Sequence, residues 1–144
     1  VACLQALEVD VAHMLGIGRS DERVEVFLFQ TKGAYQEYLD RRFPGVPVRR
    51  ALYIKGAGPG MVHAYLNRGF DVDLRHEATH ALLHSTLPMV PLWLDEGLAE
   101  YFEVARDERA FEHPHLSAVR RGLWLGRVPR LDRLETKREI SEMN

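Results

Sequence analysis

The chain has 144 residues, a length typical of one domain with one hydrophobic core. Hydrophobic residues make up 46% of it and charged residues 28%, which excludes disordered, collagen-like and low-complexity proteins. The 19 basic and 21 acidic residues give a net charge of −2, so no overall positive field favours a nucleic-acid partner. We therefore expect a single domain over residues 1–144, either a minimal core or a fragment of a longer protein.

The single cysteine, Cys3, cannot form an internal disulfide, so packing must hold the fold together. Every apolar run is far shorter than the roughly 20 residues of a membrane-spanning helix, and we expect no membrane span. The chain starts at Val1 without a recognisable leader, which we interpret as the mark of a trimmed or processed protein. The sequence leaves both export and a cytoplasmic location open, and it leaves the oligomeric state undetermined.

The spacing of apolar residues, interrupted by glycine and proline, predicts helices and strands in a mixed order. In chain order we expect a helix at 1–15, a strand at 23–29, a helix at 31–42 and strands at 51–55 and 61–66, with a glycine-rich hairpin turn at 56–60. Four helices are expected to follow, at 73–85, 92–105, 115–125 and 130–143. This order predicts an α+β fold with a small sheet and several helices after it.

The strongest chemical signal is the sequence His-Glu-Ala-Thr-His at 76–80. Histidines at i and i+4 of a helix lie on one face, about 6 Å apart along the axis, so both imidazoles can reach one metal ion. Glu77 projects roughly 100° around the axis from His76, where it can take a proton from a water molecule at the metal. His76 and His80 are therefore candidate ligands, and Glu77 is a candidate general base.

A third ligand is expected on the helix at 92–105. If this helix packs antiparallel to the preceding one, His80 and Glu96 each lie about five residues, or roughly 7 Å, from the connecting turn and meet at the same level. One turn further on, Glu100 would accept a hydrogen bond from the nitrogen of His76 that does not bind metal. Three protein ligands leave a fourth position open to water, the arrangement of a catalytic zinc site, and we predict Zn²⁺ as the cofactor.

These residues resemble the gluzincin metallopeptidases, the group that includes thermolysin and the zinc aminopeptidases. The segment Pro-Leu-Trp-Leu-Asp-Glu-Gly-Leu-Ala-Glu-Tyr-Phe-Glu at 91–103 looks especially like the small bacterial peptidase-MA-like domains. The resemblance covers roughly residues 74–103. It implies a zincin-like fold, in which a small mixed sheet packs against the active-site helix, and zinc-dependent hydrolysis of peptide bonds.

Carried over residue by residue, the resemblance implies the same roles as the spacing. His76, His80 and Glu96 would bind zinc, and Glu77 would be the general base and proton shuttle. Glu100 would accept a hydrogen bond from a zinc-binding histidine without binding the metal itself. The family also uses a strand before the active-site helix to hold the substrate backbone, and residues 61–66 are the candidate. For the donor that stabilises the transition state, the sequence leaves His113, His115 and Tyr101 open.

Some charged and polar residues outside this set have simpler interpretations. His84 lies about 12 Å from His76 along a straight helix, too far for a shared ion, so we interpret it as structural. Basic pairs at 41–42, 49–50 and 120–121 are interspersed with acidic residues and lack stacking aromatic partners. We interpret these pairs as solvated surface, which agrees with the expectation of no nucleic-acid partner.

Two rival interpretations of the metal constellation stay open. A catalytically inactive zincin-like domain could use the same cleft as a peptide- or protein-binding module, since a fold does not dictate an activity. A zinc ion acting only as a structural clip would make the domain unfold on chelation. Glu77 favours the catalytic interpretation, because a site without turnover has no use for a general base. We therefore expect a zinc metallopeptidase acting on peptide or protein substrates.

Overall fold

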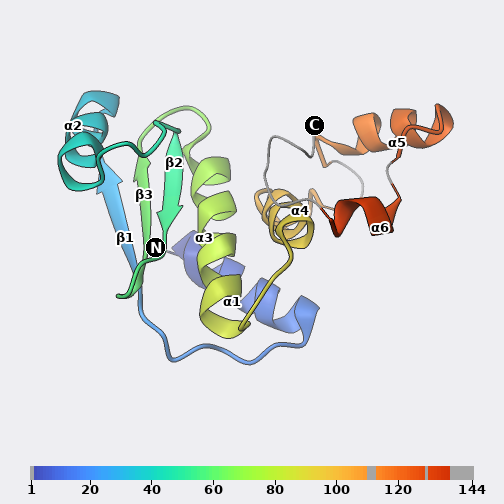
Figure 1. Cartoon of the computed structure of the whole chain (residues 1–144), viewed down its shortest axis with the longest axis horizontal. Helices are drawn as coiled ribbons and strands as arrows, with labels where there is room; N and C mark the ends of the chain where they lie inside the picture. The colour runs from blue at the N-terminus through green and yellow to red at the C-terminus, as the bar shows by residue number, and fades with distance from the viewer. Residues whose placement is uncertain (1, 110–112, 129, 137–144) are drawn as a thin grey trace.

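The computed structural model describes residues 2–109, 113–128 and 130–136. In chain order its elements are α1 (Ala2–Leu15), β1 (Val24–Phe29), α2 (Lys32–Arg42), β2 (Ala51–Ile54), β3 (Gly60–Tyr65), α3 (Phe70–Thr86), α4 (Leu92–Phe102), α5 (Leu116–Trp124) and α6 (Leu131–Leu134). The three strands form one sheet, with α2 beside it and α3 on its other side (Figure 1). The predicted α+β class is confirmed.

The sheet is mixed, and its strand order is β1-β3-β2. β1 runs parallel to β3, with Phe27 opposite His63, and β2 runs antiparallel to β3, with Tyr53 opposite Val62. The predicted hairpin turn therefore joins β2 to β3. Because β3 is central, its backbone pairs with a neighbour on both sides. β2 lies at the edge of the sheet, next to α3.

Helix α3 lies between two parts of the hydrophobic core, which fixes its position and rotation. Between α3 and the sheet lie the buried side chains of Ala51, Val62, Ala64, Leu74 and Ala81. On the side toward α1 and α4 lie those of Leu7, Val11, Ala78, Leu83 and Phe102. Burying one large apolar side chain stabilises a fold by about 1.5–3 kcal/mol. Packing on two sides therefore holds this helix, with its polar side chains, in one orientation.

The other face of the sheet packs on α2 through aromatic rings. Helix α2 begins after Thr31, whose side chain accepts a hydrogen bond from the backbone N–H of Ala34. His63 on β3 points into this layer and is fully buried, with its ring stacked 4.8 Å from the ring of Phe27. Burial lowers the pKa of His63, which keeps the imidazole neutral in its aromatic surroundings.

Two helices differ from the predicted ranges where tertiary contacts add or remove a turn. Helix α3 begins at Phe70, three residues earlier than predicted, because Phe70 packs against the core between α3 and the sheet. Helix α4 ends at Phe102 rather than at 105. After it, the buried Arg109 donates to the carbonyl oxygen of Val104 and pairs with Asp10 on α1, which stabilises the turn.

The C-terminal helices agree with the sequence only in part. The prediction of a helix at 115–125 is confirmed by α5. The prediction at 130–143 is met by one turn, α6, and residues 137–144 lie outside the described part of the chain. None of the helices in the described ranges has the length and apolar character needed to cross a membrane.

Candidate metal centre

Two adjacent helices bring the three predicted ligands together. His76 and His80 lie one turn apart on α3, and Glu96 lies in the first half of α4, which packs directly on α3. One ligand atom from each residue can be chosen so that all three lie within 4.8 Å of one another. The separations are 3.7 Å between Nε2 of His76 and Glu96 Oε2, and 3.9 Å between Nε2 of His80 and Glu96 Oε1.

These separations fit one ion. A tetrahedral ion with ligand bonds of about 2.1 Å holds its ligand atoms about 3.4 Å apart. This is a few tenths of an ångström closer than the two contacts with Glu96, which involve different oxygens, and at most about 1.4 Å closer than the limit of 4.8 Å for one atom from each residue. The three side chains are mostly buried, with 22% of His76, 10% of His80 and 19% of Glu96 exposed. The site therefore has the donor atoms, the spacing and the partial access that metal binding needs.

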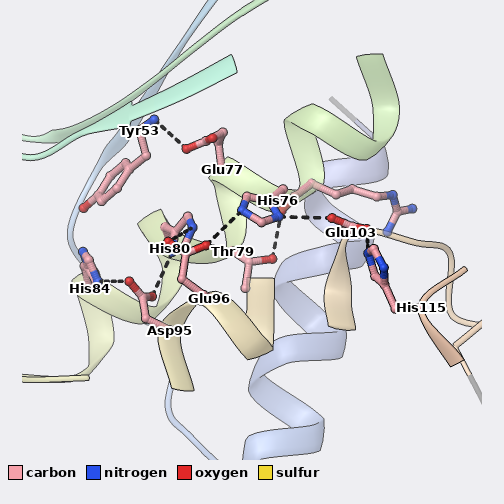
Figure 2. A network of polar contacts seen from close by, with 11 residues as sticks. Tyr53, His76, Glu77, Thr79, His80, His84, Asp95, Glu96, Glu103 and His115 are labelled. Atoms are coloured by element: carbon pink, nitrogen blue, oxygen red, sulfur yellow. Dashed lines mark hydrogen bonds and ion pairs between the residues drawn. The ribbon is translucent and has the colours of Figure 1, made fainter. Parts of the chain in front are cut away.

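Each histidine ring is oriented by a carboxylate at its other nitrogen (Figure 2). Nδ1 of His76 donates to Glu103 Oε2 over 3.1 Å, and Nδ1 of His80 lies 2.9 Å from Asp95 Oδ1. A carboxylate can only accept, so the hydrogen bond to Glu103 places a proton on Nδ1 of His76 and leaves its Nε2 for the metal when the ring is neutral. The short contact with Asp95 favours the same tautomer of His80. Carboxylates behind ligating histidines are a recurrent feature of metal sites.

The predicted role of Glu100 is wrong, and Glu103 takes its place. The Glu100 side chain is exposed, whereas only 12% of the Glu103 side chain is exposed. At 100° per residue, Glu100 projects about 40° from Glu96, away from the buried face that contains Asp95. Glu103 projects about 20° from Glu96 in the opposite sense, toward that face. Counting turns from the bend therefore missed Glu103, which lies about 4.5 Å further along the helix axis and at a different rotation.

Asp95 is a second residue that the sequence did not single out. It is buried on α4, and its other oxygen, Oδ2, accepts a hydrogen bond from Nε2 of His84 over 3.0 Å. His84 is absent from the three-residue group whose atoms could share an ion, in agreement with the spacing argument, and it fixes Asp95 instead. The signal in the sequence was the adjacent pair Asp95 and Glu96, which point to successive positions around α4.

The electrostatics of the cluster follow from these contacts. Burial lowers the pKa of His76, but hydrogen bonds to Glu103 and Glu96 outweigh it and raise the pKa to about 10. Burial raises the pKa of Asp95, but its contacts with His80 and His84 outweigh it and lower the pKa to about 2. The contact with His76 also lowers the pKa of Glu96. Carboxylates surround the histidines, so positive charge is strongly favoured there.

Glu77 lies beside the ligand group and faces the sheet. Its Oε2 accepts a hydrogen bond of 2.7 Å from the backbone N–H of Tyr53 on the edge strand β2 (Figure 2). Glu77 also lines a cleft of about 370 Å³ together with His76, Ala51 and His115. The carboxylate is therefore accessible from the cleft and is held by the end of a strand.

The expectation that residues 61–66 hold a substrate backbone is wrong. These residues form most of β3, whose backbone groups pair with β1 on one side and β2 on the other. The edge strand β2 is the one next to the cleft, which Ala51 lines. The order of strands along the chain does not reveal which strand is at the edge, because that depends on whether β1 pairs with β2 or with β3.

Of the three residues left open for a transition-state donor, one lies at this cleft. His115 lines it, and its Nε2 is 3.3 Å from Glu103 Oε1. Tyr101 and His113 line a second pocket, which His115 also borders, and their rings are stacked 6.4 Å apart.

Taken together, two imidazoles and one carboxylate can hold a metal ion and leave room for a further ligand, with another carboxylate close by. Comparison of the chain with protein-family models, with curated proteins and with solved structures finds no match in any of the three.

Proposed function

We propose that this chain is a zinc-dependent peptidase of the gluzincin type, with a zincin-like fold. The observation that carries the proposal is the convergence of His76, His80 and Glu96 on one point. Glu77 is adjacent to His76, and these two residues line one cleft. Two imidazoles with one carboxylate favour zinc over the hard cations Mg²⁺ and Ca²⁺, which prefer all-oxygen sites. A site with three protein ligands and an open position is the form that catalytic zinc takes.

A zinc ion in this position would polarise a substrate carbonyl and lower the pKa of a water molecule. Glu77 would accept the proton of that water and return it to the leaving amine nitrogen. Before that, the hydrogen bond from the N–H of Tyr53 keeps the Glu77 carboxylate in place. Glu103 and Asp95 would hold the two histidine rings in the tautomer that binds metal.

The edge strand supplies a place for the substrate backbone. Within the described part of the chain β2 pairs with β3 alone, so an extended peptide could add beside it as a further strand, next to the Tyr53 N–H that Glu77 occupies. A peptide in that position would run past Glu77, because Tyr53 of β2 contacts Glu77 directly. This arrangement supports a peptide as the substrate class.

The decisive experiment is Glu77→Gln in the zinc-loaded full chain. We expect peptide hydrolysis to fall about 10²- to 10⁴-fold, because the amide cannot take up the proton. Zinc should remain at one per chain, because Glu77 is not a ligand and glutamine can still accept from Tyr53. Metal analysis and cleavage of a broad peptide library measure the two quantities, and Glu37→Gln on α2, far from the cleft, is the matched control.

Two outcomes would contradict the proposal. Hydrolysis by Glu77→Gln at the native rate would exclude the general-base role. Zinc at one per native chain with no cleavage of any library peptide would favour a binding module that grips peptides without turnover. Unfolding of the native chain on chelation, again without cleavage, would favour a structural zinc.

A further inference from the structure

The arginine pair at 49–50, interpreted from sequence as solvated surface, lies at the cleft. Arg49 and Arg50 come directly before β2, and both line the same cleft as His76 and Glu77. The fold carries them there because α3 begins alongside the start of β2. Arg50 contacts α3 directly, with its Nη2 2.8 Å from Asp73 Oδ1.

Two arginines line the cleft, and only one of them has a carboxylate partner within the described ranges. Asp73 pairs with Arg50, Glu103 pairs with His76 and His115, and Glu77 accepts from the N–H of Tyr53. Arg49 also lines the cleft, and within the described ranges its guanidinium makes no ion pair with any carboxylate. The cleft thus offers a bound molecule one unneutralised cation, with five N–H donors in a planar fork suited to a carboxylate.

The spacing of residues along α3 indicates how far Arg49 lies from a peptide bond placed at Glu77. Asp73 precedes Glu77 by one turn, about 6 Å along the axis, and Asp73 holds Arg50 at that level. Arg49 is the next residue along the chain, and consecutive Cα atoms are about 3.8 Å apart. An extended peptide advances about 3.3 Å per residue, so a group near Arg49 would be two or three residues from a bond placed at Glu77.

We propose that Arg49 is a specificity-determining residue, and that the cleft selects peptides with a carboxylate two or three residues from the cleaved bond. Arg50, whose charge is paired with Asp73, lies next to it in the chain. The inference rests on the proposed peptidase function and names its substrate class. The carboxylate can come from an acidic side chain or from the free C-terminus of the peptide, and in both cases the bidentate contact with Arg49 is the same.

The test compares matched peptides in the zinc-loaded full chain. Internally quenched peptides carry Glu or Gln at each position within three residues of the cleaved bond, each with a free or an amidated C-terminus. We expect kcat/KM to be roughly tenfold higher when the carboxylate is present at one position, as for a bidentate, charge-assisted contact with an exposed arginine. A preference confined to internal Glu identifies a side chain, and one confined to free C-termini identifies the α-carboxylate.

In the variant Arg49→Gln, the ratio of kcat/KM for peptides with and without the carboxylate should fall to near one. Arg23→Gln, which removes another exposed positive charge outside the cleft, should keep the native preference. The inference would be overturned if Arg49→Gln kept the higher kcat/KM for Glu peptides, or if the native chain cleaved Glu and Gln peptides equally well. Hydrolysis of the neutral peptides would in that case still support the proposed function.

Binding gives a readout that does not depend on turnover. Fluorescence anisotropy with the same Glu and Gln peptides on Glu77→Gln should show the roughly tenfold difference in Kd, and Glu77→Gln combined with Arg49→Gln should lose it. If the native chain cleaves no peptide but this difference in Kd is found, the peptidase proposal fails and the carboxylate subsite stands. Equal Kd values for the Glu and Gln peptides would overturn the subsite.

Discussion

At the scale of single residues, the candidate metal centre is governed by carboxylates that do not bind the ion. Glu103 and Asp95 each face the Nδ1 atom of one histidine, and His84 fixes Asp95 from behind. A histidine ring free to rotate would lose side-chain entropy on binding metal, whereas these rings are already held. We therefore expect the affinity of the site for metal to depend on Glu103 and Asp95, which contact the histidines and not the ion.

Replacing Glu103 tests this dependence. Glu103→Gln keeps the shape of the side chain but removes the negative charge facing His76, and we expect zinc affinity to fall about 10- to 100-fold. Glu100→Gln, on the exposed side of α4, should leave it unchanged. Competition with a chromogenic chelator measures both. The reverse ranking, with Glu100 the more important, would restore the original sequence prediction.

At the scale of elements, α3 and α4 form the unit that carries the site. Phe102 at the end of α4 is fully buried against α1 and α3, in the core that also contains Leu7 and Ala78. This contact sets the rotation of α4 and so directs Glu96 toward the histidines. The packing that stabilises the fold is therefore also the packing that aligns the ligands.

Phe102→Ala should show this coupling. Removing the ring leaves a cavity in the core, and we expect the free energy of unfolding to fall by about 3–5 kcal/mol. Chemical denaturation measures the loss, with Trp124→Ala on α5 as the control, since 85% of Trp124 is exposed. If Phe102→Ala were as stable as the native chain, the core between α1, α3 and α4 would not hold α4 in place.

At the scale of the whole molecule, the charge of the site makes metal binding depend on pH. In the metal-free chain the pKa of His76 is raised to about 10, whereas in the unfolded chain it is near its ordinary value of 6.5. Protonated His76 therefore stabilises the metal-free fold below pH 6.5, and this contribution is lost as pH rises through 10. A metal ion must displace that proton, because only a neutral imidazole binds it.

We expect the apparent Kd for zinc to tighten about tenfold per pH unit above pH 6.5, with one proton released from His76 per ion bound. Calorimetric titration at pH 6.5 to 8.5, in buffers with different ionisation enthalpies, measures both the affinity and the protons released. In the variant Glu103→Gln, which removes one cause of the raised pKa, the pH dependence should weaken. A Kd independent of pH, with no proton release, would contradict the cause assigned to the pKa.

The elements and the ligand set could be predicted because they depend on local periodicity. The i, i+4 spacing of His76 and His80 places two imidazoles on one face of any α-helix, whatever surrounds it. The distance of Glu96 from the proline-containing turn placed it near the same level. The predictions for Glu100 and for residues 61–66 were wrong. The first depended on the rotation of α4 about its axis, and the second depended on the order of the strands in the sheet.

The sequence alone therefore determined the α+β class, the residues able to ligate a metal and the neighbouring carboxylate of Glu77. Only the tertiary structure decided that Glu103 and Asp95 orient the histidines, that β2 is the edge strand and that Arg49 lies at the cleft. The physical reason is the range of the interactions. Helix periodicity acts over a few residues, whereas helix rotation and strand order are set by burial of side chains far apart in the chain.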